Sequence, residues 1–218
     1  MIWNKKVLDY AWPFATFGVF TWIQQSSSRW ALGQFSSVSD VGLFALVMQI
    51  GYAPVLALTG FATVLITPIL FEMAGEAKQG DRIDDVKDFS NKLAFCGLLV
   101  TAFMVVFCAL FHNGIFRLLV SEQYHGVSNF LPAVVAAGGI FAIGQIYANR
   151  ILALWMSKVL IPTTIVSSLI GTIAAYVGAY YFSILGAVYA MLVYSTVYLA
   201  MLLVIVKNRG ADAHIASL

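Results

Sequence analysis

Eight polar side chains in this sequence stand inside or beside stretches that are otherwise apolar. Amide side chains both donate and accept hydrogen bonds, which suits ligands rich in hydroxyl groups. A planar guanidinium binds two oxygens of a phosphate at once. The candidates for ligand contact are Gln24, Gln25, Ser28, Arg29, Gln49, Gln145, Asn149 and Arg150.

The same residues also have a purely structural interpretation. Gln and Asn in membrane helices often only bond a neighbouring helix, which contributes ~0.6 kcal/mol on average. A long arginine side chain can reach from a helix end to the membrane interface. Ligand contact and helix packing are therefore both open for the amides. Ligand contact and interface anchoring are both open for Arg29 and Arg150.

No catalytic or metal-binding pattern accompanies these residues in the sequence. There is no nucleophile–base pair, phosphate-binding loop or Cys/His metal spacing. His112 and His125 lie thirteen residues apart without a third ligand, and the acids in 81–88 lack calcium-loop spacing. Cys96 and Cys108 would lie roughly 18 Å apart along a helix, too far for a disulfide. We therefore expect no enzyme activity, no metal and no cofactor.

The elements that must position the polar residues are membrane helices. The chain is 61% hydrophobic and 10% charged, whereas soluble domains are about 25% charged. Each apolar run is near or above the ~20 residues that cross ~30 Å of hydrocarbon as a helix. We predict an all-α membrane protein with six spans, at residues 8–28, 41–71, 93–111, 130–155, 159–182 and 184–206.

The distribution of positive charge predicts the orientation of these spans. Cationic loops resist translocation, so an excess of Lys and Arg marks the cytoplasmic side. With the N-terminus inside, the outer segments carry only Arg29 and Arg117, and both termini are cytoplasmic. The formal charge of +2 and the lack of a basic, aromatic-rich cluster speak against nucleic-acid binding. The inner segments carry Lys5, Lys6, Lys78, Arg82, Lys87, Lys92, Arg150, Lys158, Lys207 and Arg209.

Several local patterns predict how the helices bend and meet. Pro54 favours a kink, the charged segment 72–90 is the main inner loop, and residues 115–119 favour a short interfacial helix. A tight outer turn is expected at 183–186. No repeat or linker divides the chain, so residues 1–209 form one unit and 210–218 a cytoplasmic tail. Small groups predict close helix packing at Ser167, Gly171, Ala175 and Gly178.

The order of these features resembles a known family over most of residues 5–207. A helix with Pro13 near its start leads to a polar outer end and to Ser28–Arg29–Trp30. The segment LGQFSSVSDVGLFALVMQIG opens a long span that ends in Pro68 and Glu72. The segments IFRLLVSEQY and LGAVYAMLVYS complete the series. It is similar to one lobe, the C-terminal one above all, of the polysaccharide (O-antigen) flippases in the multidrug/oligosaccharidyl-lipid/polysaccharide exporter superfamily.

The resemblance implies that the chain flips a lipid-linked oligosaccharide across the bacterial inner membrane during cell-surface polysaccharide (lipopolysaccharide) synthesis. The eight polar residues would then line the substrate path, with Arg29 near the outer rim and Arg150 toward the inner rim to meet phosphate. Family members carry two lobes that rock in alternating access. The expected partners are therefore a second six-helix lobe or a homodimer, together with membrane lipids.

Two other functions fit the same residues. One is a non-transporting membrane scaffold for glycan-assembly enzymes, in which the polar stripes only hold helices together. The other is half of a multidrug exporter. Labelling of residues 145 and 149 from water distinguishes a wet path from dry helix contacts.

Overall fold

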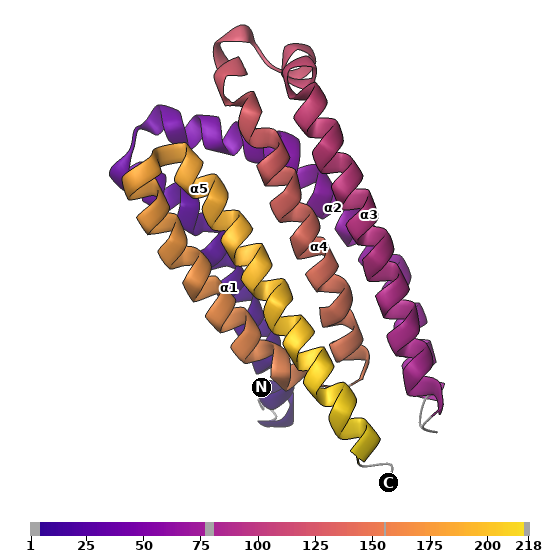
Figure 1. The fold of residues 1–218 in the computed structure, drawn as a ribbon. Helices are drawn as coiled ribbons and strands as arrows, with labels where there is room; N and C mark the ends of the chain where they lie inside the picture. Colours follow the sequence, from indigo (N-terminus) through magenta and orange to yellow (C-terminus); the bar gives the residue numbers. More distant parts are fainter. Residues whose placement is uncertain (1–4, 77–80, 155, 216–218) are drawn as a thin grey trace.

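The computed structural model describes residues 5–76, 81–154 and 156–215, and these residues are helical almost throughout (Figure 1). Proline lies inside α2 at Pro54 and Pro68 without ending it. The elements in chain order are α1 (Lys5–Phe35), α2 (Val38–Glu76), α3 (Asp81–Leu119), the 3₁₀ helix η1 (Glu122–Phe130), α4 (Leu131–Ala153), the 3₁₀ turn η2 (Ser157–Val159) and α5 (Leu160–Ile215).

The prediction of six spans is wrong, although the all-helical class agrees with the structure. Among the described residues, four helical stretches are long and apolar enough to cross a membrane. The chain therefore has the character of a membrane protein with four candidate spans. They are Val38–Gly75, Asp84–Leu119, Glu122–Ala153 and Ser157–Asn208.

Two features account for the difference between six and four. The described part of helix α1 contains no candidate span, and it carries the polar run Gln24–Arg29. The predicted spans 159–182 and 184–206 correspond to the two arms of the single element α5, whose backbone is non-helical at Ser183, and together they make one candidate stretch, Ser157–Asn208.

Helix α5 reverses its direction at Ser183, as the two antiparallel arms in Figure 1 show. Ser183 has φ 49° and ψ −129°, the geometry of the first central residue of a type II′ turn. Beside this turn, a Cβ on Gly178 would lie 2.6 Å from the carbonyl oxygen of Gly186. Only glycine allows the arms, residues 160–182 and 184–215, to approach so closely. The expected tight turn at 183–186 and the close packing at Gly178 are therefore confirmed, whereas the outer position of the turn stays a prediction.

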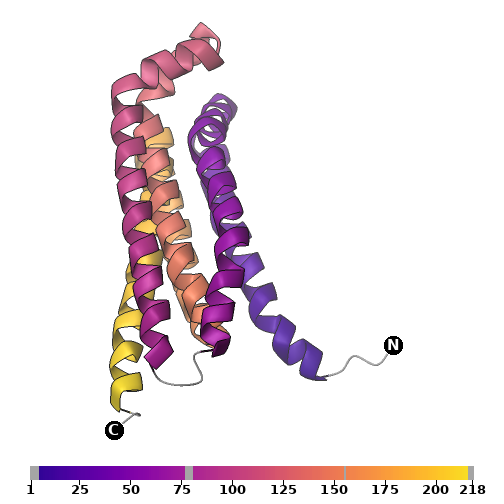
Figure 2. The same ribbon diagram turned by 90° about the vertical axis from the view of Figure 1, so that its right-hand side faces the viewer.

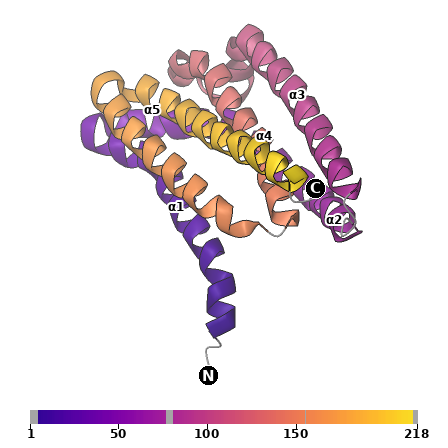
Figure 3. The same ribbon diagram turned by 60° about the horizontal axis from the view of Figure 1, so that its bottom comes forward.

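The arrangement of the helices defines two ends of the bundle. At the end that we call the terminal end, α1 begins, α5 ends, and α2 is followed by α3 (Figures 1 and 2). At the opposite end, which we call the hairpin end, lie η1, the α1–α2 connection and the reversal in α5. Seen with the terminal end forward, α1 and α3 lie on opposite sides of the assembly (Figure 3).

Helix α4 is the central element, because it packs on α2, α3 and α5. In its most apolar stretch 56% of the residues are buried, compared with 6% for α2 and 11% for α3. Large apolar side chains such as Phe61 and Phe103 are therefore exposed on α2 and α3. Exposed apolar surfaces of this kind are typical of helices that contact the hydrocarbon core of a lipid bilayer.

Two sequence expectations at the loops need correction. Residues 115–119 do not form a separate interfacial helix, because they complete α3, and η1 follows. The segment 72–90 is only partly a loop, since α2 continues to Glu76 and α3 already begins at Asp81. Charged side chains are well hydrated at the ends of long helices, so the helices extend past their apolar parts.

Candidate functional site

The eight predicted site residues do not converge on a single cavity. Gln24 and Ser28 are buried on α1, whereas Gln25 and Arg29 are exposed on the same helix. Gln49 is exposed on α2, and the other three residues lie on α4. The structure therefore separates the predicted set into six surroundings. They are an exposed face of α1, the α1–α5 interface, the exposed surface of α2 at Gln49, a small cavity beside α4, a larger groove, and the buried position of Arg150 on α4.

The exposed face of α1 carries three different chemical groups in a row. Trp22, Gln25 and Arg29 follow one another at i, i+3 and i+7, so they share one side of the helix. The indole of Trp22 is 61% exposed and meets the ring of Trp30 edge to face, with ring centroids 5.4 Å apart. Trp22 was not among the sequence candidates. It could have been selected from the sequence, because its spacing from Gln25 and Arg29 places all three residues on one side of a helix.

Gln24 lies in a polar cluster inside the α1–α5 interface. Its side chain is 2% exposed, and its Cγ would lie 3.3 Å from a Cβ added to Gly171 of α5. Its Oε1 has no hydrogen-bond partner within the described part of the chain. A buried polar atom without a partner carries a desolvation cost of about 1–3 kcal/mol. Among the described residues, the hydroxyls of Thr21 on α1 and of Ser168, Thr172 and Ser195 on α5 are likewise buried and unpartnered.

Gln145 faces a cavity of about 130 Å³ between α1, α4 and the start of α5. Its Nε2 donates a hydrogen bond of 3.3 Å to the hydroxyl of Tyr198 on the second arm of α5. The other lining residues include Phe17 of α1 and Ser157 of η2. Gln145 therefore has one hydrogen bond between helices and also borders an open space, so both of its predicted roles are compatible with its position.

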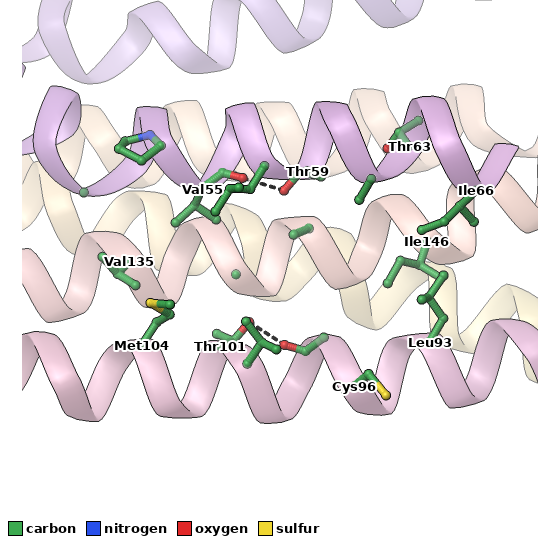
Figure 4. Close-up of a pocket in the computed structure, with 18 of the residues that line it drawn as sticks. Val55, Thr59, Thr63, Ile66, Leu93, Cys96, Thr101, Met104, Val135 and Ile146 are labelled. Carbon is green, nitrogen blue, oxygen red and sulfur yellow. Dashed lines mark hydrogen bonds between the residues drawn. The ribbon is translucent and has the colours of Figure 1, made fainter.

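A groove of about 450 Å³ runs between α2 and α3, with α4 as its floor. In Figure 4, Val55 and Thr59 of α2 point toward Thr101 and Met104 of α3, and Val135 of α4 lies between them. The hydroxyls of Thr59 and Thr101 donate to carbonyls of their own helices, each at 2.7 Å. These hydroxyls are thus satisfied, and the groove presents a mainly hydrocarbon surface. Asn149 is its amide-bearing residue.

Arg150 follows Asn149 on α4 and is not itself among the residues that line the groove. Four residues before it, Ile146 lines the groove, and three residues after it, Ala153 packs between Leu70 of α2 and Val86 of α3. Arg150 thus lies between the groove and this closing cluster on the side of α4 that faces α2 and α3. The side chain is only 5% exposed. Within the described ranges the guanidinium makes no hydrogen bond or ion pair.

The hairpin end holds a second polar arrangement, which the sequence analysis did not select. Ser37 and Asp40 form a capping box at the start of α2, because the amide of each donates to the side chain of the other, at 3.1 and 3.2 Å. The Oδ2 of Asp40 also accepts bonds from the hydroxyls of Ser36 and Ser183. The sequence contains the pattern of this capping box, Ser37-Val38-Ser39-Asp40, directly before an apolar run.

Comparisons of the chain with protein-family models, with curated proteins and with solved structures gave no match. The similarity to the flippase family therefore stays a prediction from the residues.

Proposed function

We propose that this chain is one lobe of a membrane transporter that moves a lipid-linked oligosaccharide across the bacterial inner membrane. It works with a second lobe or a second copy of itself, and the two rock around a path at their interface in alternating access. Both termini lie on the cytoplasmic side. The resemblance of the sequence to polysaccharide flippases and the order of its polar segments support this proposal.

The observation that carries the proposal is the exposed face of α1 with Trp22, Gln25 and Arg29. An indole offers a flat apolar face together with a polar edge, an amide donates and accepts hydrogen bonds, and a guanidinium binds phosphate. An oligosaccharide on a lipid phosphate needs all three kinds of contact. Amide and guanidinium groups are costly in contact with hydrocarbon, so this face belongs against water, cargo or a second polypeptide.

The polar character of the described part of α1 supports the same assignment. This part contains no candidate span, although it packs along α5, whose arms are strongly apolar. A helix with one buried side and one polar exposed side suits the wall of a water-filled path between two lobes. The exposed amide of Gln49 on α2 is a further group that needs a polar contact.

The test is export of surface glycan in source cells that lack the gene for this chain and are complemented with variants. The double variant Gln25→Leu with Arg29→Leu removes the polar groups of the α1 face and keeps its exposure. The matched control is Gln123→Leu, which changes an equally exposed amide on η1, away from the bundle interior. We expect loss of surface glycan and accumulation of lipid-linked intermediates with the double variant, at a normal protein level, and no change with the control.

Two outcomes would overturn the proposal. One is normal surface glycan in cells without the chain, after inactivation of any second flippase gene. The other is full complementation by the double variant. Protection of cells from cationic dyes without a glycan defect would indicate a drug exporter instead.

One observation favours the scaffold function as a second candidate. The amide of Gln145 is hydrogen-bonded to Tyr198, as a residue that only joins helices would be. Cysteine substitutions at residues 25 and 149, made in a background with Cys96→Ala and Cys108→Ala, separate the two functions. Modification of both by a membrane-impermeant reagent from one side of the membrane indicates a wet path. Complete protection of residue 25 indicates a dry contact and a scaffold.

A further inference from the structure

Aromatic side chains gather beside the turn of α5 at the hairpin end. The ring of Phe35, the last residue of α1, meets Tyr176 and Tyr180 edge to face, with ring centroids 6.1 and 5.3 Å apart. Tyr180 meets Tyr181 in the same way at 4.8 Å, and the ring of Tyr181 lies 6.3 Å from that of Phe182. We call these five residues the aromatic cluster. Tyr180, Tyr181 and Phe182 are 62%, 69% and 64% exposed, and an exposed patch of such rings marks an interaction surface.

The aromatic cluster lies on a different side of α1 from the exposed polar face of that helix. Phe35 follows Arg29 by six residues, which is ~240° around a helix with 3.6 residues per turn. On α5 the cluster continues an exposed apolar surface, because Val177 and Ile173 precede Tyr181 by four and eight residues on the same side of the first arm. The cluster is therefore continuous with the surface that faces hydrocarbon and separate from the surface assigned to the cargo.

The two arms of α5 place the aromatic cluster one bilayer thickness away from two lysines. The stretch 159–206 contains no charged residue, and the exposed Lys158 and Lys207 flank it at the terminal end. Lys158 precedes Tyr181 by 23 residues and Lys207 follows Ile184 by 23 residues, which corresponds to ~35 Å of helix in each arm. The hydrocarbon core of a bilayer is ~30 Å thick. When the lysines lie at one headgroup region, the tyrosines therefore lie at the other.

The chemistry of these side chains suits the two headgroup regions. A tyrosine at the membrane–water interface keeps its ring among the acyl chains, while its hydroxyl bonds water or a headgroup. In the middle of the bilayer the same hydroxyls would lack partners, and in bulk water the exposed rings would form an unfavourable apolar patch. At the other end of α5, the ammonium groups of the two lysines are complementary in charge to anionic headgroups.

We propose that the aromatic cluster binds the headgroup region of the lipid bilayer and thereby anchors the hairpin end of the bundle at a fixed depth. The partner of this surface is phospholipid. Ser183, the next residue after the cluster, donates a hydrogen bond to Asp40, so the anchor also fixes the depth of the α1–α2 connection. The inference does not depend on glycan transport, because it applies equally to a transporter lobe and to a scaffold.

Spin labels on the full-length chain measure the depth of the cluster in vesicles of phosphatidylethanolamine and phosphatidylglycerol. In a background with Cys96→Ala and Cys108→Ala, Ile173→Cys and Phe182→Cys each provide one exposed labelling site on the first arm of α5. Collisions of the label with oxygen report hydrocarbon, and collisions with a water-soluble nickel chelate report water. We expect the label at residue 173 to meet oxygen alone and the label at residue 182 to meet both probes.

Substitution of the two exposed tyrosines tests whether they set this depth. Tyr180→Leu with Tyr181→Leu removes the hydroxyls and keeps apolar side chains, so the arm should sink into hydrocarbon. We expect collisions of the label at residue 182 with the chelate to fall roughly twofold or more. Tyr180→Trp with Tyr181→Trp keeps rings that have a polar edge, and these collisions should stay unchanged. The matched control is Phe103→Leu, which changes an exposed ring on α3 that has no hydroxyl and should also leave them unchanged.

Several results would overturn the inference. Oxygen collisions alone at residue 182 would place the cluster inside the hydrocarbon core. Chelate collisions alone would place it in water, within reach of a soluble partner such as a free glycan. Chelate collisions at residue 173 would show that this arm does not cross hydrocarbon. Unchanged collisions in the leucine double variant, or an equal fall in the tryptophan double variant, would show that the tyrosines do not set the depth. The two labels alone decide the placement if a tyrosine variant does not fold.

Discussion

The hydroxyl of Ser183 lies 2.7 Å from the hydroxyl of Ser36, although 147 residues separate them in the chain. Ser183 is the point at which α5 reverses, and Ser36 lies in the connection between α1 and α2. Asp40 accepts hydrogen bonds from both hydroxyls. The hairpin end of the bundle is thus held by one carboxylate that caps α2 and joins it to the turn in α5.

Substitutions at Ser183 should separate backbone strain from the loss of the hydroxyl. A positive φ is unfavourable for residues other than glycine and most so for β-branched ones. We therefore expect Ser183→Val to lower the free energy of unfolding by about 1–3 kcal/mol. Ser183→Gly relieves the strain but loses the bond to Asp40, so its net effect should stay within about 1 kcal/mol. Unfolding of the purified chain in mixed detergent, followed by circular dichroism, measures both. Equal destabilisation by the two variants would contradict this account.

Replacement of Asp40 by Asn should weaken the hairpin end. The Oδ2 of this carboxylate accepts the bonds from the amide of Ser37 and from the hydroxyls of Ser36 and Ser183, and hydrogen bonds to a charged oxygen are stronger than those to a neutral amide oxygen. Loss of a helix cap typically costs about 0.5–2 kcal/mol, and we expect a loss of that size. Asp88→Asn is the control, because Asp88 is an exposed acid on α3. The prediction fails if both variants unfold at the same denaturant concentration.

Alanine at two glycines should have opposite effects. At Gly178 a Cβ would lie 2.6 Å from the backbone oxygen of Gly186, and backbone cannot move aside as a side chain can. Gly178→Ala should separate the two arms of α5 and lower stability by about 1–3 kcal/mol. At Gly60 a Cβ meets nothing within 4 Å, so Gly60→Ala should raise helix stability by up to about 1 kcal/mol. In thermal aggregation curves we expect the midpoint temperature of Gly178→Ala to lie below that of the wild type and the midpoint temperature of Gly60→Ala to lie above it.

The sequence predicted the helical class and the apolar stretches because hydrophobic residues and helical spacing are local properties. It also predicted the tight turn near Ser183 and the close contact at Gly178, since small residues at helical spacing favour close packing. The reversal between the two arms of α5 depends on the backbone conformation of Ser183. A positive φ at this serine cannot be predicted from the sequence, because residues other than glycine adopt it rarely.

The candidate site was predicted only in part, for a physical reason. Polar residues in apolar stretches can be selected from the sequence, but their grouping depends on which helices pack together. Gln145 and Asn149 lie four residues apart, yet one borders the cavity beside α5 and the other the groove beside α2. The groove itself is lined by Val, Leu, Thr and Gly, which are ordinary residues for a buried helix contact. Its existence follows from the separation of α2 and α3, which no local pattern encodes.

Replacement of Gln24 by leucine should reduce function without lowering stability. Its Oε1 is buried without a partner in the described part of the chain, and leucine has a similar volume. Gln24→Leu therefore removes a desolvated polar group, and we expect it to leave the free energy of unfolding unchanged or raise it by up to about 1–3 kcal/mol. If Gln24 serves the substrate path, the same variant should reduce glycan export. Detergent unfolding and the complementation assay measure the two effects on one protein. Destabilisation by more than about 1 kcal/mol would show instead that the amide bonds a partner in the interior of the membrane-bound chain.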